Sequence, residues 1–319
     1  PGTLRRMTEP RTVRAAVVQS GGICFDTPAT LERLRPLVAR AAGEGARLVV
    51  VPEAFVGGYP KGTTFGTVVG DRDPAGREWF RRYHAGAIDL PGPELGELCA
   101  MAREHEVTLV AGVVERDGWT LYCTVVFIGP DGTYLGKHRK LMPTAAERLV
   151  WGRGDGSTLT VVDTGFGKIG AVICWENYVP LLRAAMYAKG VEIYCAPTVD
   201  GRDGWTASMR HIALEGRCFV ISANQFTRRS DYPADFPTTA GDDPETIVLR
   251  GGSCIVDPLG KVLAGPLWDQ EGIITAEIDL SAVTQALFDF DPVGHYSRPD
   301  VFSLHVDKQA KRIEDQLLL

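Results

Sequence analysis

Glu53, Lys140 and Cys174 are the residues whose types and positions best suit covalent chemistry on an electrophilic carbon. Each follows a segment that we expect to be a strand, and ligands of α/β sheets gather beyond the carboxyl ends of the strands. In one pocket, the carboxylate can accept the thiol proton, the thiolate can attack a carbon atom, and the ammonium group can stabilise developing charge. Taken singly, Glu53 could instead be a solvated strand end and Lys140 part of a basic turn.

Cys174 lies at an expected junction between a strand and a helix. The small and apolar residues 170–173 indicate a buried strand, and residues 177–189 indicate a helix that Asn177 caps. The positive end of the helix dipole would then favour the thiolate form of Cys174. The alternative is that Cys174 only fills space in the core, as most cysteines in apolar runs do. The other cysteines fit that alternative: Cys24, Cys99, Cys123, Cys195, Cys218 and Cys254.

Composition and charge narrow the classes of function. The chain has 319 residues, of which 45% are hydrophobic and 23% are charged, as in ordinary globular proteins. Its formal net charge is −6 and its basic residues are dispersed, which argues against nucleic acid or an anionic membrane as a partner. No apolar run approaches the ~20 residues of a membrane span. The seven cysteines are an odd number in a large chain, which favours reduced thiols in the cytoplasm. They lack metal-type spacing, so no metal site is indicated. We expect neither a metal nor an organic cofactor.

The order of the expected elements predicts a mixed α/β fold with mixed sheets, because both crossovers and hairpins are indicated. No linker divides the chain, so we expect a single domain over residues 13–300. Residues 1–12 are expected to form an N-terminal tail, and residues 301–319 a C-terminal tail that contributes to an interface. The first residue is proline and the last three are leucines, so we expect a trimmed chain.

Local patterns add three expectations about particular segments. Thr27 and Pro28 predict the start of a helix, and Pro36 should kink that helix or end its first part. Gly129-Pro-Asp-Gly132 predicts a hairpin turn. The polar segment Thr227–Arg250 is expected to be a long loop, functional or mobile.

Three sequence blocks resemble those of the carbon–nitrogen hydrolases and, within that family, the nitrilases. They are Val-Val-Val-Pro-Glu53-Ala-Phe, Gly-Lys-His-Arg-Lys140-Leu-Met-Pro-Thr-Ala-Ala-Glu147, and Gly-Ala-Val-Ile-Cys174-Trp-Glu-Asn-Tyr-Val-Pro. Their order and spacing match the Glu–Lys–Cys triad of the family, and the resemblance covers nearly the whole chain. The run Cys-Trp-Glu-Asn resembles plant-like and bacterial nitrilases that act on aliphatic and arylaliphatic nitriles, rather than the amide-cleaving branches.

The resemblance implies a four-layer α-β-β-α sandwich and a second glutamate, Glu147, beside the triad. Glu147 would orient Lys140 and relay protons to the departing ammonia, and the backbone N–H of Trp175 would help Lys140 to bind the charged intermediate. The alternative is that Glu147 only caps a helix that starts at Thr144, since their spacing fits a capping box. The expected pocket wall consists of Tyr59, Thr144, Trp175 and Tyr178.

The activity implied is hydrolysis of an organic nitrile to a carboxylic acid and ammonia through a cysteine thioimidate and thioester, with water as co-substrate. Two alternatives use the same triad: amide or carbamoyl hydrolysis, and a nitrilase that also releases some amide, as a nitrile hydratase does. A catalytically silent assembly protein is a further alternative, against which the intact triad argues. The resemblance also implies dimer-based homo-oligomers, including spirals or filaments, assembled through insertions at Tyr59–Pro74 and Thr227–Arg250.

Overall fold

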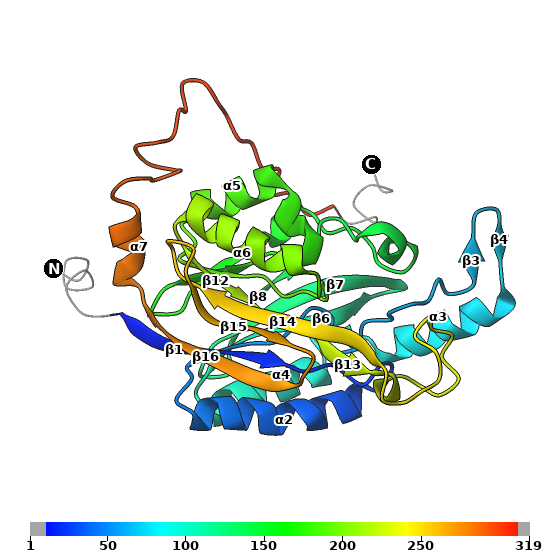
Figure 1. Cartoon of the computed structure of the whole chain (residues 1–319). Helices are drawn as coiled ribbons and strands as arrows, with labels where there is room; N and C mark the ends of the chain where they lie inside the picture. The colour runs from blue at the N-terminus through cyan, green and yellow to red at the C-terminus, as the bar shows by residue number, and fades with distance from the viewer. Residues whose placement is uncertain (1–10, 312–319) are drawn as a thin grey trace.

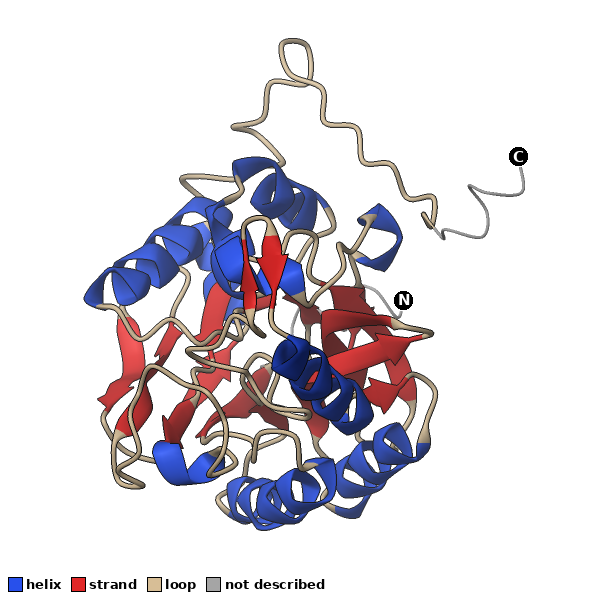
Figure 2. Ribbon diagram, turned by 90° about the vertical axis from the view of Figure 1, so that its right-hand side faces the viewer, coloured by secondary structure: helices blue, strands red, loops and turns tan. Residues whose placement is uncertain are grey.

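Two β-sheets face each other at the centre of the computed structural model, which describes residues 11–311 (Figures 1 and 2). The first sheet has the strand order β16-β1-β2-β6-β7-β8, with β5 paired to β6. Strands β1, β2 and β6 run parallel, whereas β16, β7 and β8 pair with their neighbours in the antiparallel sense. The bounds are β1 Thr12–Gln19, β2 Leu48–Val50, β5 Ile88–Asp89, β6 Thr108–Asp117, β7 Thr120–Ile128, β8 Tyr134–Arg139 and β16 Gly272–Asp279.

The second sheet repeats this plan, with the strand order β13-β14-β12-β11-β10-β9 and β15 paired to β14. Strands β10, β11 and β12 form its parallel centre, and the remaining pairs are antiparallel. The bounds are β9 Val161–Asp163, β10 Lys168–Ala171, β11 Ile193–Cys195, β12 Phe219–Ser222, β13 Phe226–Arg228, β14 Ile247–Val256 and β15 Val262–Trp268. Both sheets are therefore mixed, as the sequence predicts.

Helices cover the outer face of each sheet, so that the layers follow the order helix, sheet, sheet, helix (Figure 1). Helices α2 and α4 pack on the first sheet, and α5 and α6 pack on the second. The bounds are α2 Thr27–Gly43, α3 Pro74–Gly86, α4 Pro93–Glu104, α5 Pro180–Ala188, α6 Asp203–Gly216 and α7 Ser281–Ala286. This is the four-layer sandwich that the resemblance implies.

Alternating side chains of the strands build two kinds of core. In β1, Val17 faces the second sheet, whereas its neighbour Val18 faces the helices. The same alternation places Ile221 of β12 between the sheets and Val220 against α6. Because successive residues of a strand point to opposite faces, a strand buried on both faces needs a continuous apolar run, and the central strands have one.

Helix α2 begins one residue earlier than a Thr27 cap would place it, because Asp26 accepts a hydrogen bond from the backbone N–H of Ala29. The expected break at Pro36 does not occur, since the helix continues to Gly43. Proline removes one N–H from a helix interior, but burial of Leu34, Val38 and Ala41 against the first sheet holds this helix together. The helix therefore does not end at Pro36.

Two excursions project from the sandwich on the same side. The first contains the small hairpin of β3 Thr67–Val68 and β4 Asp71–Arg72 followed by α3, which the sequence pattern did not reveal (Figure 1). The second is Thr227–Arg250, which is a loop only in its middle. Its two ends pair as β13 and β14, with Phe226 opposite Arg250 and Thr227 opposite Leu249, so the expectation of one continuous loop was wrong.

The hairpin expected at Gly129–Gly132 is present between β7 and β8. Within residues 11–311 no helix combines the length and apolar character that crossing a bilayer requires. Residues 1–10 and 312–319 lie outside the described residues, and with them most of the expected N-terminal tail and the last part of the expected C-terminal tail. The remainder of the C-terminal tail is extended and largely exposed.

Candidate active site

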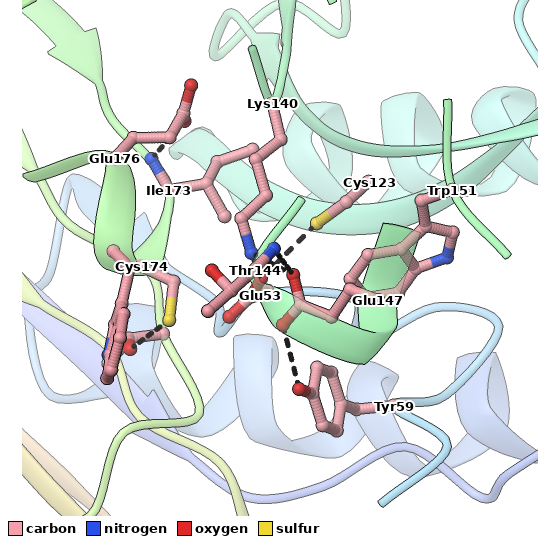
Figure 3. A network of polar contacts seen from close by, with 12 residues as sticks. Glu53, Tyr59, Cys123, Lys140, Thr144, Glu147, Trp151, Ile173, Cys174 and Glu176 are labelled. Carbon is pink, nitrogen blue, oxygen red and sulfur yellow. Dashed lines mark hydrogen bonds and ion pairs between the residues drawn. The ribbon is translucent and has the colours of Figure 1, made fainter. Parts of the chain in front are cut away.

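The strands of both sheets deliver polar side chains to one region of the sandwich interior. Glu53 follows β2 of the first sheet, and Lys140 directly follows β8 of the same sheet. Cys174 follows β10 of the second sheet, and Thr198 follows the neighbouring β11. Strand β8 runs in the same direction as β2, because two antiparallel pairs separate it from β6, so the carboxyl ends of both strands lie at the same edge of the first sheet. The parallel neighbours β10 and β11 do the same in the second sheet. Figure 3 shows Glu53, Lys140 and Glu147 grouped together with Cys174 beside them.

Glu53 is fully buried and uses only one of its two carboxylate oxygens in hydrogen bonds to described residues. Its Oε1 accepts a hydrogen bond from Lys140 Nζ at 2.6 Å and one from the Cys123 thiol at 3.5 Å. Its Oε2 has no hydrogen-bond partner among residues 11–311 that satisfies ordinary geometry. Burial raises the pKa of Glu53, although the Lys140 ammonium opposes this effect, and so does the nearby Cys174 thiol. The carboxylate is thus held on one side and free on the other.

Lys140 is fully buried between two carboxylates. Its Nζ donates to Glu53 Oε1 at 2.6 Å and to Glu147 Oε2 at 2.7 Å. Burial alone would lower the pKa of Lys140, but the charge of Glu53 and other anionic groups holds that pKa well above its usual value. Lys140 is therefore an ammonium group throughout the physiological pH range.

Glu147 both caps a helix and contacts Lys140. Its Oε2 accepts a hydrogen bond from the backbone N–H of Thr144 at 2.7 Å, which caps the short 3-10 helix η1 Ala145–Leu149. The same oxygen accepts the bond from Lys140, and Oε1 accepts one from the Tyr59 hydroxyl at 2.8 Å. The cap therefore fixes the carboxylate in the position from which it contacts Lys140.

Cys174 begins a 3-10 helix, η3 Cys174–Tyr178, and not an α-helix. Helix α5 starts only at Pro180, so the expectation of a helix capped by Asn177 was wrong. The Asn177 amide instead donates to the backbone carbonyls of Val172 and Cys174, at 2.9 Å and 2.7 Å. These bonds hold Cys174 at a φ of 50°, a left-handed conformation that is costly for residues other than glycine.

The Cys174 thiol is buried, and its environment favours the neutral form. Burial raises its pKa above the usual value, and the charge of Glu53 acts in the same direction. The thiolate expected from a helix dipole is therefore not the resting form, because η3 is short and the Cys174 N–H already donates to Pro197 O at 2.9 Å. The Thr198 hydroxyl donates to Sγ at 3.2 Å, which partly offsets the burial. A neutral thiol needs a base to remove its proton, and Glu53, whose charge acts on this thiol, has a carboxylate oxygen without a hydrogen-bond partner among residues 11–311.

A cavity of about 500 Å³ opens beside Glu147. Tyr59 and Thr144 line it, as expected for the pocket wall, together with Trp151 and Phe65. Its lining side chains and backbone combine apolar rings with hydroxyl groups and one carboxylate. Such a mixture suits a small organic molecule that has a polar group at one end.

Two expected wall residues lie elsewhere. Tyr178 is half exposed and lines a different, shallower hollow next to Arg183. The indole N–H of Trp175 donates to Asp200 Oδ2 at 2.9 Å, and the guanidinium carbon of Arg202 lies 4.5 Å from the ring centroid. Neither Tyr178 nor Trp175 lines the cavity beside Glu147. They follow Cys174 on the outer side of η3, which sequence spacing alone did not reveal.

Sequence reasoning also missed two neighbours of the site. Cys123, which we expected only to fill space, directs its thiol at Glu53 Oε1. Thr198, whose hydroxyl donates to the Cys174 sulfur, was not among the expected site residues. A signal for Thr198 existed, since it is a polar residue just after a buried strand, as Glu53 is. No comparable signal marks Cys123. Within the described residues no group of three or more His, Cys, Asp or Glu side chains is placed to hold a metal ion.

The site groups a buried thiol, a buried carboxylate and an ammonium group on an α-β-β-α sandwich. The carbon–nitrogen hydrolase family profile matches residues 14–287. Among solved structures, a carbon–nitrogen hydrolase of Helicobacter pylori has a TM-score of 0.71 at 23% identity, over 92% of this chain and 97% of that one. At that identity the likeness shows the fold alone.

Sequence relatives are much closer. A bifunctional nitrilase/nitrile hydratase of Nicotiana tabacum is 61% identical over 303 residues, which cover 94% of this chain and 87% of that protein. An aliphatic nitrilase of Sinorhizobium fredii is 56% identical over 298 residues, which cover 93% of this chain and 96% of that protein. The chain belongs to the carbon–nitrogen hydrolase family, and within it to the nitrilases.

Proposed function

We propose that the protein hydrolyses an organic nitrile to the carboxylic acid and ammonia, with Cys174 as nucleophile, Glu53 as general base and Lys140 as the electrostatic stabiliser. The observation that carries this assignment is the state of Glu53: one oxygen is held by Lys140, and the other is free beside a neutral, buried thiol. The raised pKa of Glu53 makes it a stronger base than an ordinary glutamate. A stronger base removes the thiol proton more efficiently.

The first half of the reaction forms the covalent bond. Glu53 Oε2 accepts the proton of Cys174 Sγ while the sulfur adds to the nitrile carbon. The nitrogen takes up a proton from the Lys140–Glu147 pair, which gives a thioimidate. Lys140 and the backbone N–H of Trp175 stabilise the negative charge that develops on the substrate.

In the second half, Glu53 first passes the proton it took from Cys174 to the Lys140–Glu147 pair through its hydrogen bond with Lys140, which restores both groups. Glu53 then activates a water molecule that adds to the thioimidate carbon. If the tetrahedral intermediate expels ammonia, protonated through Lys140 and Glu147, a thioester remains, and a second water releases the acid. If the intermediate expels Cys174 first, an amide leaves instead. The partition between acid and amide thus depends on whether nitrogen or sulfur is protonated sooner.

Amide release is a second candidate activity, and one comparison favours it. The relative from Nicotiana tabacum is a bifunctional nitrilase/nitrile hydratase, and it is 61% identical to this chain. We therefore propose that some amide accompanies the acid. Hydrolysis of amides or carbamoyl compounds as the main activity has less support, because the amidase of Nesterenkonia sp. shares only 20% identity and so shows the fold alone.

A panel of aliphatic and arylaliphatic nitriles with their matched amides tests the function. We expect ammonia and acid from at least one nitrile, with the amide as a minor product detected by chromatography. Turnover of amides without turnover of any nitrile would contradict the proposal. Cys174→Ala is the blank for both substrates, because it removes the attacking sulfur and little else.

Several further properties are proposed with the function. A free Cys174 thiol is essential to the chemistry, which supports a reducing compartment such as the cytoplasm. Residues 13–300 are proposed as one domain, and residues 301–319, of which 301–311 are largely exposed, as part of an interface between copies. Val68 and Val69 are exposed at the β3–β4 hairpin, which supports the two insertions as contacts in a dimer-based homo-oligomer, including spirals or filaments.

A further inference from the structure

The carboxylate of Glu176 contacts the backbone beside two of the proposed catalytic residues. Glu176 lies in η3 and its side chain is 1% exposed. Its Oε2 accepts a hydrogen bond from the N–H of Ile173 at 2.9 Å, and its Oε1 accepts one from the N–H of Leu141 at 2.6 Å. Ile173 immediately precedes Cys174, and Leu141 immediately follows Lys140. Figure 3 shows Glu176 directed at Ile173.

Through Glu176, the hydrogen bond to Leu141 connects strand ends of the two sheets. Lys140 follows β8 of the first sheet, whereas Cys174 follows β10 of the second. An acidic residue in the first turn of a helix commonly bonds to the N–H just before that helix, and the bond to Ile173 is of this kind. Such a cap uses one oxygen only. The bond to Leu141 goes beyond capping and fixes the distance between the ends of strands from different sheets.

His138 holds the Glu176 carboxylate from a third direction. Its Nε2 lies 3.0 Å from Glu176 Oε2, and its Nδ1 lies 3.1 Å from the carbonyl oxygen of Thr158. Each ring nitrogen therefore faces an oxygen atom, and a proton on Nε2 donates to the Glu176 carboxylate. Both side chains are buried, since each is 1% exposed.

We propose that Glu176 is a positioning residue for the nitrilase reaction, because its carboxylate sets the separation of the Cys174 sulfur from the Lys140 ammonium group. The inference rests on the proposed function of those two residues. Glu53, Lys140 and Glu147 are linked to one another by hydrogen bonds, and β2 and β8 of the first sheet support Glu53 and Lys140. Of these four residues, only Cys174 follows a strand of the second sheet. Its position relative to Lys140 therefore depends on a contact between the sheets.

A shift of Cys174 relative to Lys140 should mainly affect the partition between acid and amide. Ammonia leaves only if Lys140 and Glu147 deliver a proton to nitrogen, whereas the thiol leaves if sulfur is protonated first. When the sulfur shifts from the ammonium group by a fraction of an ångström, the bound nitrogen shifts with it and its protonation slows. The amide share of the product should then rise. This share is a ratio within the active molecules, so partial unfolding of a sample does not change it.

The test is Glu176→Gln, which keeps the shape of the side chain but replaces one acceptor oxygen by a donor. One of the two backbone N–H groups then faces another N–H group. We expect kcat to fall at least tenfold, because misplacement by about 1 Å costs about 100-fold in rate. KM should stay within twofold of the wild-type value, and the ratio of amide to acid should rise at least threefold.

Glu115→Gln is the matched control. The Glu115 side chain is 2% exposed and accepts hydrogen bonds from Arg139 and Lys137, which belong to the same strand as His138. The described contacts of Glu115 lie within the first sheet, so its loss should leave the ratio of amide to acid at the wild-type value. Equal changes of that ratio in both variants would overturn the proposal, and so would a folded Glu176→Gln protein with wild-type kcat and product ratio.

A second pair of variants applies if Glu176→Gln does not fold. His138→Gln still offers an N–H donor to the carboxylate, whereas His138→Leu offers none. We expect the product ratio of His138→Gln to stay closer to that of the wild type, and equal ratios would overturn the proposal. A wild-type protein that hydrolyses only amides would contradict the proposed function, and kcat of Glu176→Gln on the amide would still test Glu176.

Discussion

Burial and neighbouring charges shift the pKa values of three ionisable groups of the site. Cys174 and Glu53 are buried, which raises both pKa values, while Lys140 remains charged between its carboxylates. A neutral thiol beside a basic carboxylate is a stable resting pair that reacts only when an electrophile arrives. The thiol is thereby protected from unproductive oxidation, since the thiolate is the reactive form.

Cys174→Ala should abolish turnover and leave the fold intact. The substitution removes one sulfur atom, so the packing loss is small compared with the ~2–5 kcal/mol of larger core truncations. Ammonia release from a nitrile should fall to the blank, while the thermal unfolding midpoint stays within a few degrees of the wild type. Measurable nitrile turnover by the variant would exclude Cys174 as the nucleophile.

The acid limb of kcat/KM should lie above the usual pKa of a glutamate, 4.5, because the pKa of Glu53 is raised. As pH falls through that raised pKa, Glu53 gains a proton and can no longer act as a base. The charge of Glu147 contributes to the shift, so Glu147→Gln should move the remaining acid limb to lower pH.

Tyr59→Phe is the control for this titration. It removes the hydroxyl that binds Glu147 without removing a charge, so the acid limb should stay near its wild-type position. Initial rates between pH 4 and 9 would supply the profiles. An upward shift of the limb in Glu147→Gln would contradict the assignment to Glu53.

At the level of elements, the strand β6 supports the turn that presents Glu53. A Cβ atom on Gly112 of β6 would lie 2.1 Å from the carbonyl oxygen of Pro52 and 2.8 Å from the Cα of Glu53. Only a residue without a side chain allows this approach. A second anchor comes from the other sheet, since the Gln225 amide donates to the carbonyl oxygen of Glu53 at 2.6 Å.

Gly112→Ala should therefore displace Glu53. We expect a destabilisation of about 1–3 kcal/mol from the backbone overlap and a fall in kcat of at least tenfold. Gly96→Ala is the control, because no atom lies within 4 Å of the added Cβ in helix α4, and it should stabilise the fold by about 0.5–1 kcal/mol. Urea denaturation together with nitrile kinetics would separate the two effects. Wild-type kcat in Gly112→Ala would show that the turn adapts.

At the scale of the whole molecule, each sheet brings different parts of the chemistry. The first brings the proposed base, Glu53, and the ammonium group of Lys140, and the second brings the proposed nucleophile, Cys174. The core between the sheets, which includes Val17, Val110, Ile193 and Ile221, therefore stabilises the fold and the site together. The β3–β4 hairpin lies outside this core and can change without loss of it.

Val69→Asp should reduce the largest assemblies and leave the activity of each site unchanged. Val69 is fully exposed at the β3–β4 turn, and a charge there opposes burial of that turn between copies. Light scattering after size-exclusion chromatography would give the masses, and Val69→Ile, which stays apolar, is the control. The proposed role of this insertion would be wrong if both variants formed the same assemblies as the wild type.

The sequence predicted most of the architecture and the central part of the site, for physical reasons. Continuous apolar runs mark strands that are buried on both faces, and the residues just beyond them, Glu53 and Lys140, lie together in the structure as expected. Contacts between distant segments could not be predicted in the same way. Two examples are the hydrogen bond from the Leu141 N–H to Glu176 and the one from the Cys123 thiol to Glu53. Both depend on how the strands and sheets pack, which no local sequence pattern encodes.

The hydrogen bond to Leu141 has a practical consequence for protein engineers. Glu176 recognises an N–H of the main chain there, so every amino acid other than proline can supply the donor. Position 141 is also only partly buried, which leaves room for different side chains. A library of all amino acids at position 141, next to Lys140, should therefore contain many active variants, whereas Leu141→Pro should be inactive.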